Sequence, residues 1–195
     1  MATFHLKTPI SENEIRKLSV KDILYLTGVI VTARDQAHKR ILEHLSQGRS
    51  LPMNLEGLAI YHCGPVVKKK GGEWIVVAAG PTTSSRLEAY AASLIEKLGV
   101  RLIIGKGGMG EKTAEAMAEH GAAYGVFTGG AALLAAKAIR RVISVEWLDL
   151  GIPEAMWAFE VEHLGPIIVA IDSHGRNLFE EVMDSAWKKA SLLDL

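Results

Sequence analysis

The sequence predicts an α/β fold with a mostly parallel sheet flanked by helices and a second, smaller sheet. Short apolar runs alternate with amphipathic helix patterns in the middle of the chain, over residues 74–79, 86–98, 100–104, 112–120 and 123–127. Strands that alternate with helices are joined by right-handed crossovers, which makes their sheet parallel. After Arg141 the strand-like runs follow one another without helices, which predicts an antiparallel portion or a second sheet.

The composition is that of one globular domain without a global electrostatic field. The 195 residues include 22 Lys and Arg, 22 Asp and Glu, and 49% hydrophobic residues. A chain of this length buries roughly 70% of its unfolded surface in one domain. We therefore expect residues 1–195 to form a single domain whose net charge attracts neither nucleic acid nor an acidic membrane.

Cysteine usage and the N-terminus limit the classes of protein further. The single cysteine, Cys63, excludes an internal disulfide and a multi-cysteine metal or cluster site made by this chain alone. The first residues contain no apolar signal core, and no apolar run reaches the ~20 residues needed to span a bilayer. These features predict a cytoplasmic protein with no metal ligands of its own.

The N-terminal part contains a helix signal, a strand and a second helix. The run Ser11-Glu12-Asn13-Glu14 matches a capping box and predicts a short helix that ends by Ser19. Residues Ile23–Thr32 are rich in β-branched side chains and predict a strand interrupted at Gly28. The amphipathic helix that follows has Gly48 as its expected C′ residue.

Two further strands are expected around a lysine-rich turn. Leu58–Cys63 predicts a strand, and Trp74–Ala79 predicts the strand that leads into the first of the site loops described below. Lys68–Gly72 between them is predicted to be a solvated hairpin loop. Its three lysines have no interleaved aromatic residues, so they make a poor nucleic-acid patch.

The C-terminal part predicts strands followed by one closing helix. An alanine-rich helix after Gly129-Gly130 is expected to end near Ile139, and Asp172–Gly175 is expected to be a turn. The predicted strands are Val142–Leu148, Ala155–His163 and Ile167–Asp172. The closing helix, Asn177–Leu193, carries its apolar side chains at helical spacing, namely Leu178, Val182, Met183 and Trp187.

Two loops that follow strands form the candidate site, Ala78–Arg86 and Gly105–Gly110. In α/β folds ligands bind outside the carboxyl ends of the strands. The second loop, G-K-G-G-M-G, offers backbone donors and the cation of Lys106 close to a helix N-terminus, which suits a small anion. A purely structural glycine turn is the alternative interpretation.

The second loop also matches the G-x-G-x-x-G pattern of dinucleotide-binding turns through Gly105, Gly107 and Gly110. However, the next strand ends without an acidic residue for a ribose hydroxyl, and the loop is not the first strand-to-helix turn of the chain. The overlapping G-x-x-x-x-G-E-K-T has Glu111 where a phosphate-binding loop has its lysine. A nucleotide-binding module is therefore a distant alternative.

Three cations, Arg34, Arg86 and Lys106, each follow a predicted apolar strand. The guanidinium group binds carboxylates through two parallel hydrogen bonds, so this arrangement indicates a substrate with more than one carboxylate. Thr82 and Thr83 precede a helix, where one hydroxyl can act as an N-cap. A non-catalytic scaffold remains possible, but the positions of the cations at strand ends favour a binding site.

Four motifs occur together in one order: T-G-V-I-V-T-A-R-D-Q-A-H-K-R (Thr27–Arg40), C-G-P-V-V (Cys63–Val67), A-A-G-P-T-T-S-S-R (Ala78–Arg86) and G-K-G-G-M-G (Gly105–Gly110). In these motifs the chain resembles the β subunit, or C-terminal domain, of iron–sulfur class I fumarate hydratases and L(+)-tartrate dehydratases. The resemblance extends to at least Asp172–Gly175. It implies a swivelling β/β/α fold.

The resemblance implies a hydro-lyase that adds water reversibly to fumarate to give (S)-malate, or one that dehydrates L(+)-tartrate. It implies a 4Fe-4S cluster that a partner α subunit ligates, so that this chain supplies only part of the site. The implied catalytic residues are Thr82, as the base, and Lys106. The implied substrate-binding residues are Arg34, Arg86, Thr83, Gly105 and Gly107.

A threonine base needs help from its surroundings. Its hydroxyl is far too weak an acid to ionise near neutral pH unless cations hold the alkoxide, and Arg86 and Lys106 are the local candidates. The sequence leaves open whether Thr82 or Thr83 is the functional hydroxyl.

Overall fold

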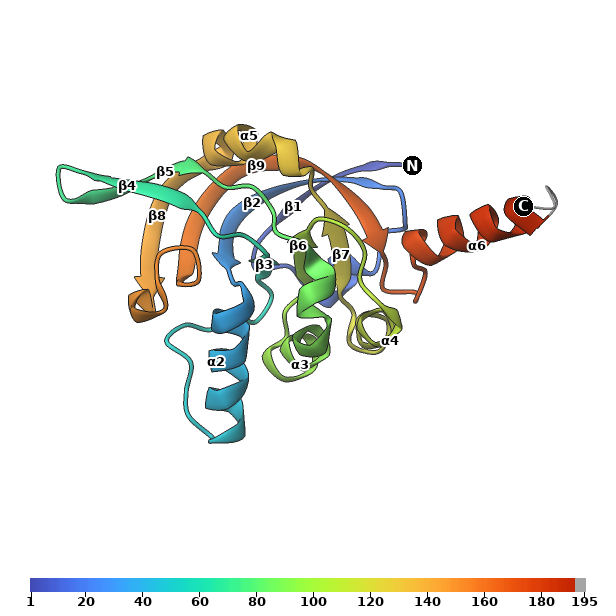
Figure 1. Cartoon of the computed structure of the whole chain (residues 1–195), viewed down its shortest axis with the longest axis horizontal. Helices are drawn as coiled ribbons and strands as arrows, with labels where there is room; N and C mark the ends of the chain where they lie inside the picture. Colours follow the sequence, from blue (N-terminus) through green and yellow to red (C-terminus); the bar gives the residue numbers. More distant parts are fainter. Residues whose placement is uncertain (192–195) are drawn as a thin grey trace.

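The structure is a computed structural model that describes residues 1–191. It is a mixed α/β fold with a seven-stranded sheet, in the order β1-β2-β3-β6-β7-β9-β8, and a two-stranded sheet, β4-β5 (Figure 1). In chain order the elements are β1 (Thr3–Lys7), α1 (Glu12–Ile15), β2 (Ile23–Thr32), α2 (Asp35–Ser46), β3 (Ala59–Tyr61), β4 (Val66–Lys70), β5 (Glu73–Ala78), 3-10 helix η1 (Ser84–Leu87), α3 (Glu88–Leu98), β6 (Leu102–Gly105), α4 (Glu111–His120), β7 (Ala123–Val126), η2 (Gly129–Ala131), α5 (Ala132–Ala138), β8 (Ile139–Glu146), η3 (Leu148–Leu150), β9 (Met156–Ile171) and α6 (Leu178–Ser191).

The large sheet closes into a ring through its longest strand. Strands β1, β2, β3, β6 and β7 run parallel to their neighbours. Strand β9 runs antiparallel to β7 and also pairs with β2, so that Ile171 lies opposite Tyr124 and Ala158 lies opposite Val31. The two pairings join the ends of the series β2-β3-β6-β7-β9, and β1 and β8 extend the sheet outside the ring.

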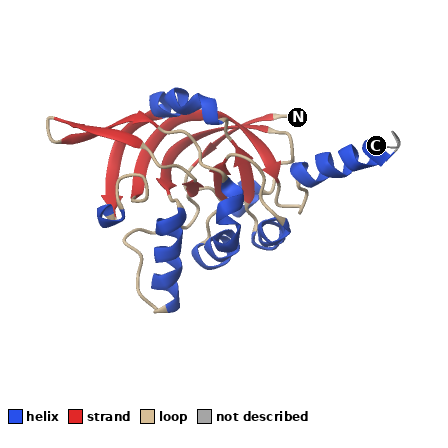
Figure 2. Ribbon diagram, in the orientation of Figure 1, coloured by secondary structure: helices blue, strands red, loops and turns tan. Residues whose placement is uncertain are grey.

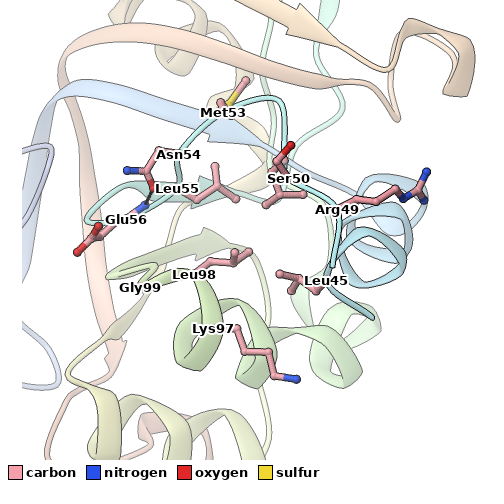
Figure 3. A pocket seen from close by; sticks show the side chains of 11 residues that line it. Leu45, Arg49, Ser50, Met53, Asn54, Leu55, Glu56, Lys97, Leu98 and Gly99 are labelled. Carbon is pink, nitrogen blue, oxygen red and sulfur yellow. Dashed lines mark hydrogen bonds between the residues drawn. The ribbon is translucent and has the colours of Figure 1, made fainter. Parts of the chain in front are cut away.

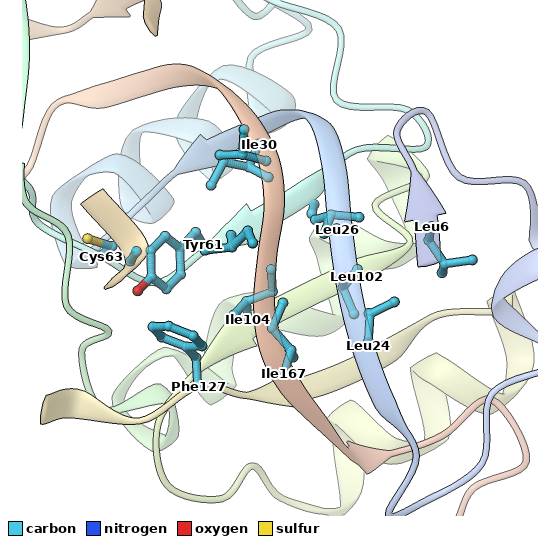
Figure 4. Packing of buried hydrophobic residues seen from close by; sticks show 14 of the residues in the cluster. Leu6, Leu24, Leu26, Ile30, Tyr61, Cys63, Leu102, Ile104, Phe127 and Ile167 are labelled. Carbon is cyan, nitrogen blue, oxygen red and sulfur yellow. The ribbon is translucent and has the colours of Figure 1, made fainter. Parts of the chain in front are cut away.

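Alternation along the strands divides the interior into two apolar clusters. In β3, Tyr61 packs into one cluster and Ile60 into the other, as expected for side chains that alternate between the faces of a sheet. The first cluster is made mainly by strand residues, such as Leu24 and Ile104, and also includes Phe127, just after β7 (Figure 4). The second lies under α2, α3 and α4, which cover one face of the sheet, whereas α5 lies on the opposite side (Figure 2).

The predicted parallel order of the middle of the chain is confirmed with one correction. The strand expected at Trp74–Ala79 exists as β5, but it pairs with β4 in the small sheet and not with the large one. The lysines expected in a hairpin loop belong to β4, and the turn itself is Gly71-Gly72, where both φ angles are positive. The parallel succession is therefore β3, α3, β6, α4 and β7.

The two ends of the chain differ from expectation more than the middle does. No local sequence pattern predicts β1, which pairs with β2 through its whole length. The two strands expected over Ala155–Asp172 are the single strand β9, with register shifts against β2. The expected antiparallel portion exists within the large sheet, and the second sheet is the β4–β5 hairpin.

Local signals in the N-terminal part were reliable. Ser11 and Glu14 form both hydrogen bonds of a capping box at the start of α1. Gly48 follows the C-cap of α2 with φ +62°, as a C′ glycine does. Gly28 has φ +108° and lies where the pairing of β2 with β9 shifts register, which is the interruption that a glycine in a strand predicts.

The C-terminal helix α6 leaves the body of the fold (Figure 1). Three of its predicted apolar side chains are exposed: Val182, Met183 and Trp187. The last two residues of the expected helix, 192 and 193, lie outside the described residues. Among residues 1–191, no helix is both long and apolar enough to cross a bilayer.

Candidate active site

The loop that follows β5 is inserted between β3 and β6 where these two strands separate. The strands pair up to Tyr61 and Ile104. Beyond that point the backbone N–H of Thr82 donates to the carbonyl of His62 at 2.6 Å, and the N–H of Lys106 donates to the carbonyl of Thr82 at 3.2 Å. The segment around Thr82 thus occupies the place of a short extra strand at the carboxyl edge of the sheet.

Further contacts fix this loop on both sides of Thr82. The hydroxyl of Tyr61 donates to the carbonyl of Ala79 at 2.6 Å, and the N–H of Ser84 donates to the carbonyl of Lys106 at 2.9 Å. Gly105 permits this approach, because a Cβ there would lie 1.8 Å from the hydroxyl of Ser84. The loop is held by buried anchors, while Thr82 and Thr83 are half-buried at the edge.

The hydroxyl of Thr83 does not serve as a cap. Thr83 occupies the N-cap position of η1 without a side-chain hydrogen bond. The contacts of Thr82 described above use its backbone and leave its hydroxyl available. The capping role that the sequence allowed for one of the two threonines is therefore wrong for Thr83.

The loop Gly105–Gly110 lies beside the first loop. Thr83 and Lys106 form an isolated parallel bridge, and the hydroxyl of Tyr124 donates to the carbonyl of Gly107 at 2.8 Å. The side chain of Lys106 is exposed and extends past Gly129, at the start of η2. Gly107 has φ +73°, so it needs the conformational freedom of glycine.

The N-terminus of α4, next to this loop, is already occupied by a carboxylate. Glu88 of α3 accepts hydrogen bonds from the N–H of Gly110 at 2.7 Å and of Thr113 at 3.1 Å. An anion at a helix N-terminus would use these same donors. The donors that a nucleotide pyrophosphate would need are therefore already bonded to Glu88. Lys106 and Gly107 are the exposed part of the loop.

Arg34 reaches the same edge from the start of α2. Its guanidinium lies against Gly64, where a Cβ would be 2.8 Å from Nη1. Its Nε is 3.3 Å from a carboxylate oxygen of Glu154, and its Nη2 is 3.9 Å from Asp35. The side chain is 24% exposed, so it is mostly buried and held in place by acidic neighbours.

Arg86 is joined to Arg34 through Asp35. The guanidinium of Arg86 donates to the carboxylate of Asp35 and is itself 50% exposed. Burial raises the pKa of Asp35, but the hydrogen bond from Arg86 and the charges of both arginines outweigh it and hold the pKa below its usual value. Asp35 is thus an ionised bridge between the two arginines.

The sequence-predicted residues meet at one edge of the molecule. Arg34 lies beside Gly64, which follows Cys63, and Cys63 forms a bridge with Pro81 next to Thr82. The carbonyl of Thr82 in turn accepts the N–H of Lys106, and Asp35 links Arg86 to Arg34. Gly105 is buried and acts in packing, whereas the backbone of Gly107 is exposed.

Cys63 does not fit the role of a cluster ligand. Its side chain is fully buried, and burial raises its pKa to about 12 despite the nearby charge of Arg34. A cluster held by another polypeptide would have to reach its ligand, and this thiol is not exposed at the edge. Within residues 1–191, no group of three His, Cys, Asp or Glu side chains is arranged to hold a metal ion.

Sequence reasoning missed four side chains that belong to the site or support it. Asp35 is next to Arg34 in the chain, but its link to Arg86 is a long-range contact. Glu154 comes from the loop before β9 and accepts from the N–H of Gln36 at 2.9 Å as well as pairing with Arg34. His38 and His62 are fully buried beneath the edge. No local pattern marks Glu154, whereas His38 lies inside the motif Thr27–Arg40 and His62 directly precedes the motif Cys63–Val67.

A hollow of about 550 Å³ lies elsewhere, between the C-terminal ends of α2 and α3 (Figure 3). Leu45, Leu55 and Leu98 line it together with Arg49 and Lys97. None of the candidate residues described above contributes to it. The candidate site is instead an open edge, which is compatible with a site that a second polypeptide covers.

Comparison with known proteins identifies the family. Residues 1–182 match the family model described as Fumarase C-terminus. The chain is 44% identical over 176 residues to the L(+)-tartrate dehydratase subunit beta of Escherichia coli (strain K12), which covers 90% of this chain and 86% of that one. It is 42% identical over 185 residues to the putative L(+)-tartrate dehydratase subunit beta of Methanocaldococcus jannaschii, covering 94% of this chain and 95% of the relative.

A third relative is a longer protein. The chain is 45% identical over 187 residues to the putative fumarate hydratase class I of Geobacillus stearothermophilus, which covers 95% of this chain but 35% of that protein. The motifs, the arrangement at the sheet edge and these matches agree, and the chain belongs to the fumarase C-terminal family, together with the beta subunits of L(+)-tartrate dehydratases.

Proposed function

We propose that this chain is the β subunit of a two-subunit hydro-lyase that hydrates fumarate reversibly to (S)-malate. The observation that carries the proposal is the meeting of Thr82, Arg34, Arg86 and Lys106 at one open edge of the sheet. The names of the relatives, dehydratase and fumarate hydratase, support the same class of reaction.

The two arginines and the lysine are the proposed carboxylate-binding groups. Arg34 is mostly buried and pairs with Glu154, and its guanidinium is the proposed fork for one carboxylate. Arg86, which shares Asp35 with Arg34, and Lys106 are more exposed and are the proposed partners of the other carboxylate. Asp35 and Glu154 offset part of the positive charge, so the edge favours a dianion without being strongly cationic.

Thr82 is the proposed base, with Thr83 as the alternative. The backbone of Thr82 is held from both sides, which fixes the position of its hydroxyl against the substrate. As an alkoxide, this oxygen takes a proton from the substrate carbon in dehydration while the substrate hydroxyl leaves as hydroxide, and in hydration the threonine hydroxyl returns the proton to the carbon as hydroxide adds. Lys106 and Arg86 are the nearest cations proposed to stabilise the oxygen when it carries negative charge.

The rest of the proposed site belongs to a partner α subunit. The relatives from Escherichia coli and Methanocaldococcus jannaschii are named as beta subunits, and the longer relative carries additional polypeptide in the same chain. We propose that this partner ligates a 4Fe-4S cluster, since this chain has a single cysteine, Cys63, and its thiol is fully buried. We also propose that the fold is a swivelling β/β/α domain, which docks on such a partner.

The second candidate substrate is L(+)-tartrate. Two of the relatives described above are tartrate dehydratase beta subunits at 42–44% identity, whereas the fumarate hydratase relative is similar at 45%. The two reactions differ in one substrate hydroxyl, which the pocket must either accommodate or exclude.

The test is anaerobic purification of the chain together with its native partner, followed by assays with both substrates. The expected result is a cysteine-bearing subunit with iron–sulfur absorbance and turnover of fumarate or L(+)-tartrate. A complex that contains such a subunit but turns over neither substrate would contradict the proposal. Calorimetric titration of the isolated chain with NAD and ATP should show no binding.

A further inference from the structure

Two histidines lie fully buried beneath the candidate site, and the proposed reaction does not use them. His38 comes from the first turns of α2, and His62 follows β3. Their ring centroids are 5.2 Å apart and the ring planes meet at 70°, so the edge of one ring faces the other. Each ring contacts a different segment of the site.

His38 holds the backbone of Arg34. Its Nδ1 lies 2.7 Å from the carbonyl oxygen of Arg34, and the backbone N–H of His38 donates to the same oxygen at 2.9 Å. A carbonyl only accepts hydrogen bonds, so the proton of neutral His38 is on Nδ1. Arg34 is the N-cap residue of α2, and this ring therefore fixes the point from which its guanidinium extends.

His62 holds the loop that carries Thr82. Its carbonyl accepts the N–H of Thr82 at 2.6 Å, and its Nδ1 pairs with the hydroxyl of Ser84 at 2.9 Å. One residue thus contacts the loop on both sides of Thr83. Because the N–H of Ser84 also donates to the carbonyl of Lys106, the same ring is coupled to the second loop.

The second ring nitrogen of each histidine, Nε2, argues against a role in packing alone. The Nε2 atoms of His38 and His62 are buried and have no hydrogen-bond partner within residues 1–191. Burial lowers the pKa of His38 to about 4 and that of His62 well below its usual value, so both rings are neutral. A buried polar atom without a hydrogen-bond partner is unfavourable, and two apolar side chains of similar shape would avoid that cost.

We propose that His38 and His62 are positioning residues, which together set the spacing between Arg34 and the segment Thr82–Ser84 for a dicarboxylate substrate. The inference rests on the proposed function of this edge. Both rings are fully buried and in edge-on contact, so a displacement of one ring affects the other. On the buried side, the pair thereby joins the two segments that Asp35 and Arg86 join at the exposed edge.

Substitution by asparagine or by glutamine distinguishes the contribution of Nδ1 from that of Nε2 in each ring. The amide of asparagine can reach the place of Nδ1, whereas that of glutamine reaches the place of Nε2. In the enzyme assembled with its partner, His38→Asn should keep KM near that of the wild type. His38→Gln should raise KM about tenfold, because Arg34 loses its anchor, with a smaller change in kcat.

The corresponding glutamine and asparagine variants of His62 should change kcat more than KM. His62→Gln loses the contact with Ser84 and displaces Thr82, so kcat should fall about 10- to 100-fold, and His62→Asn should recover most of it. If His62→Gln does not fold, Ser84→Ala removes the same contact from the other side and should lower kcat in the same direction. The control is Ser173→Ala, which removes another buried hydroxyl without a partner and should leave KM and kcat unchanged.

General destabilisation gives a different result, because a smaller folded fraction lowers the apparent kcat and leaves KM as it was. Nitrogen-15 NMR of the histidine rings adds a readout that needs no turnover, and it should find the proton of His38 on Nδ1. A His38→Gln enzyme that is folded and has wild-type KM, equal behaviour of the Asn and Gln variants, or a proton on Nε2 of His38 would overturn the inference. Absence of turnover by the wild-type complex would contradict the proposed function. Wild-type kinetics of the histidine variants, in a complex that is active, would contradict only this inference.

Discussion

Arg86, which follows the threonine loop, donates a hydrogen bond to the carboxylate of Asp35 in the first turn of α2. Two segments separated by 51 positions in the chain are thereby joined across the open edge of the sheet. Since half of the Arg86 side chain is exposed, Asp35 is the group that orients its guanidinium before a substrate arrives.

Replacing Asp35 should therefore weaken substrate binding. In Asp35→Asn the hydrogen bond loses its charge-assisted character, which roughly halves its strength, and Arg86 is less well oriented. KM should rise about three- to tenfold with little change in kcat. The matched control is Asp149→Asn, which breaks the pairing with Arg40 elsewhere on α2 and should leave KM unchanged. An equal KM in both variants would show that Asp35 does not orient the site.

Replacing Thr82 should affect the chemical step. Its backbone anchors the loop through His62 and Lys106, and these bonds survive in Thr82→Ala. The melting temperature should stay close to that of the wild type, while kcat falls about 10²- to 10⁴-fold, as expected for loss of a general base. Steady-state kinetics of Thr82→Ala and Thr83→Ala measured side by side will identify the functional hydroxyl. A large loss in Thr83→Ala alone would transfer the role to Thr83.

Arg34→Lys should raise KM more than it changes kcat. Lysine keeps the positive charge but lacks the planar fork that binds a carboxylate through two hydrogen bonds, so about a tenfold rise is expected. Arg40→Lys is the control on the same helix, because Arg40 pairs with Asp149 and is not among the candidate residues. Unchanged KM in Arg34→Lys would mean that this side chain does not contact the substrate.

Gly105→Ala should damage the site by steric conflict. The added Cβ would lie 1.8 Å from the hydroxyl of Ser84 and 3.3 Å from Nδ1 of His62. Displacing these buried groups should cost about 1–3 kcal/mol of unfolding free energy and lower kcat. Gly130→Ala provides the control, since an added Cβ there meets no atom within 4 Å. Urea unfolding of both variants will compare them, and equal stability would contradict the close approach of Ser84.

The buried state of His38 predicts a loss of stability in mild acid. Burial lowers its pKa to about 4, whereas the hydrogen bond to the Arg34 carbonyl and the charge of Asp35 act in the opposite direction. The unfolded chain binds a proton near pH 6.5 that the folded chain does not bind, so stability falls as the pH drops from about 6.5 towards 4. The contribution is roughly 3 kcal/mol in total.

The measurement is urea unfolding of the wild type and of His38→Asn between pH 5 and pH 7. Asparagine does not titrate, so the variant should lose less stability over this range than the wild type. His62, whose pKa is also lowered and whose ring faces His38, contributes in the same direction to both proteins. Identical pH dependence in the two proteins would show that His38 is not kept neutral by the fold.

Local and medium-range features of this chain were predictable from its sequence. The capping box at Ser11 and the order of strands and helices in the middle of the chain depend on residues close together in sequence. The cations Arg34 and Lys106 were assigned to one edge because each follows a strand of a parallel sheet. For Thr82 the premise was wrong, because β5 lies in the two-stranded sheet, and its loop reaches the edge by insertion between β3 and β6.

The rest depends on contacts between distant segments. The partner of Arg86 could not be read from its neighbours, and Glu154 reaches Arg34 from a loop 120 residues further along the chain. Strand β1 lacks a strong pattern of its own and forms because β2 offers it a parallel partner. The pairing of β9 with two strands at once likewise requires the assembled sheet.

The pairing of β2 with β9 affects how the protein is made. It joins residues 23–31 to residues 158–168, so the inner cluster stays open until the ribosome has delivered the last fifth of the chain. Long-range pairings of this kind form slowly, because the intervening chain must first be ordered. Nascent chains that end before Met156 should therefore bind chaperones and remain sensitive to proteases until β9 is available to pair with β2.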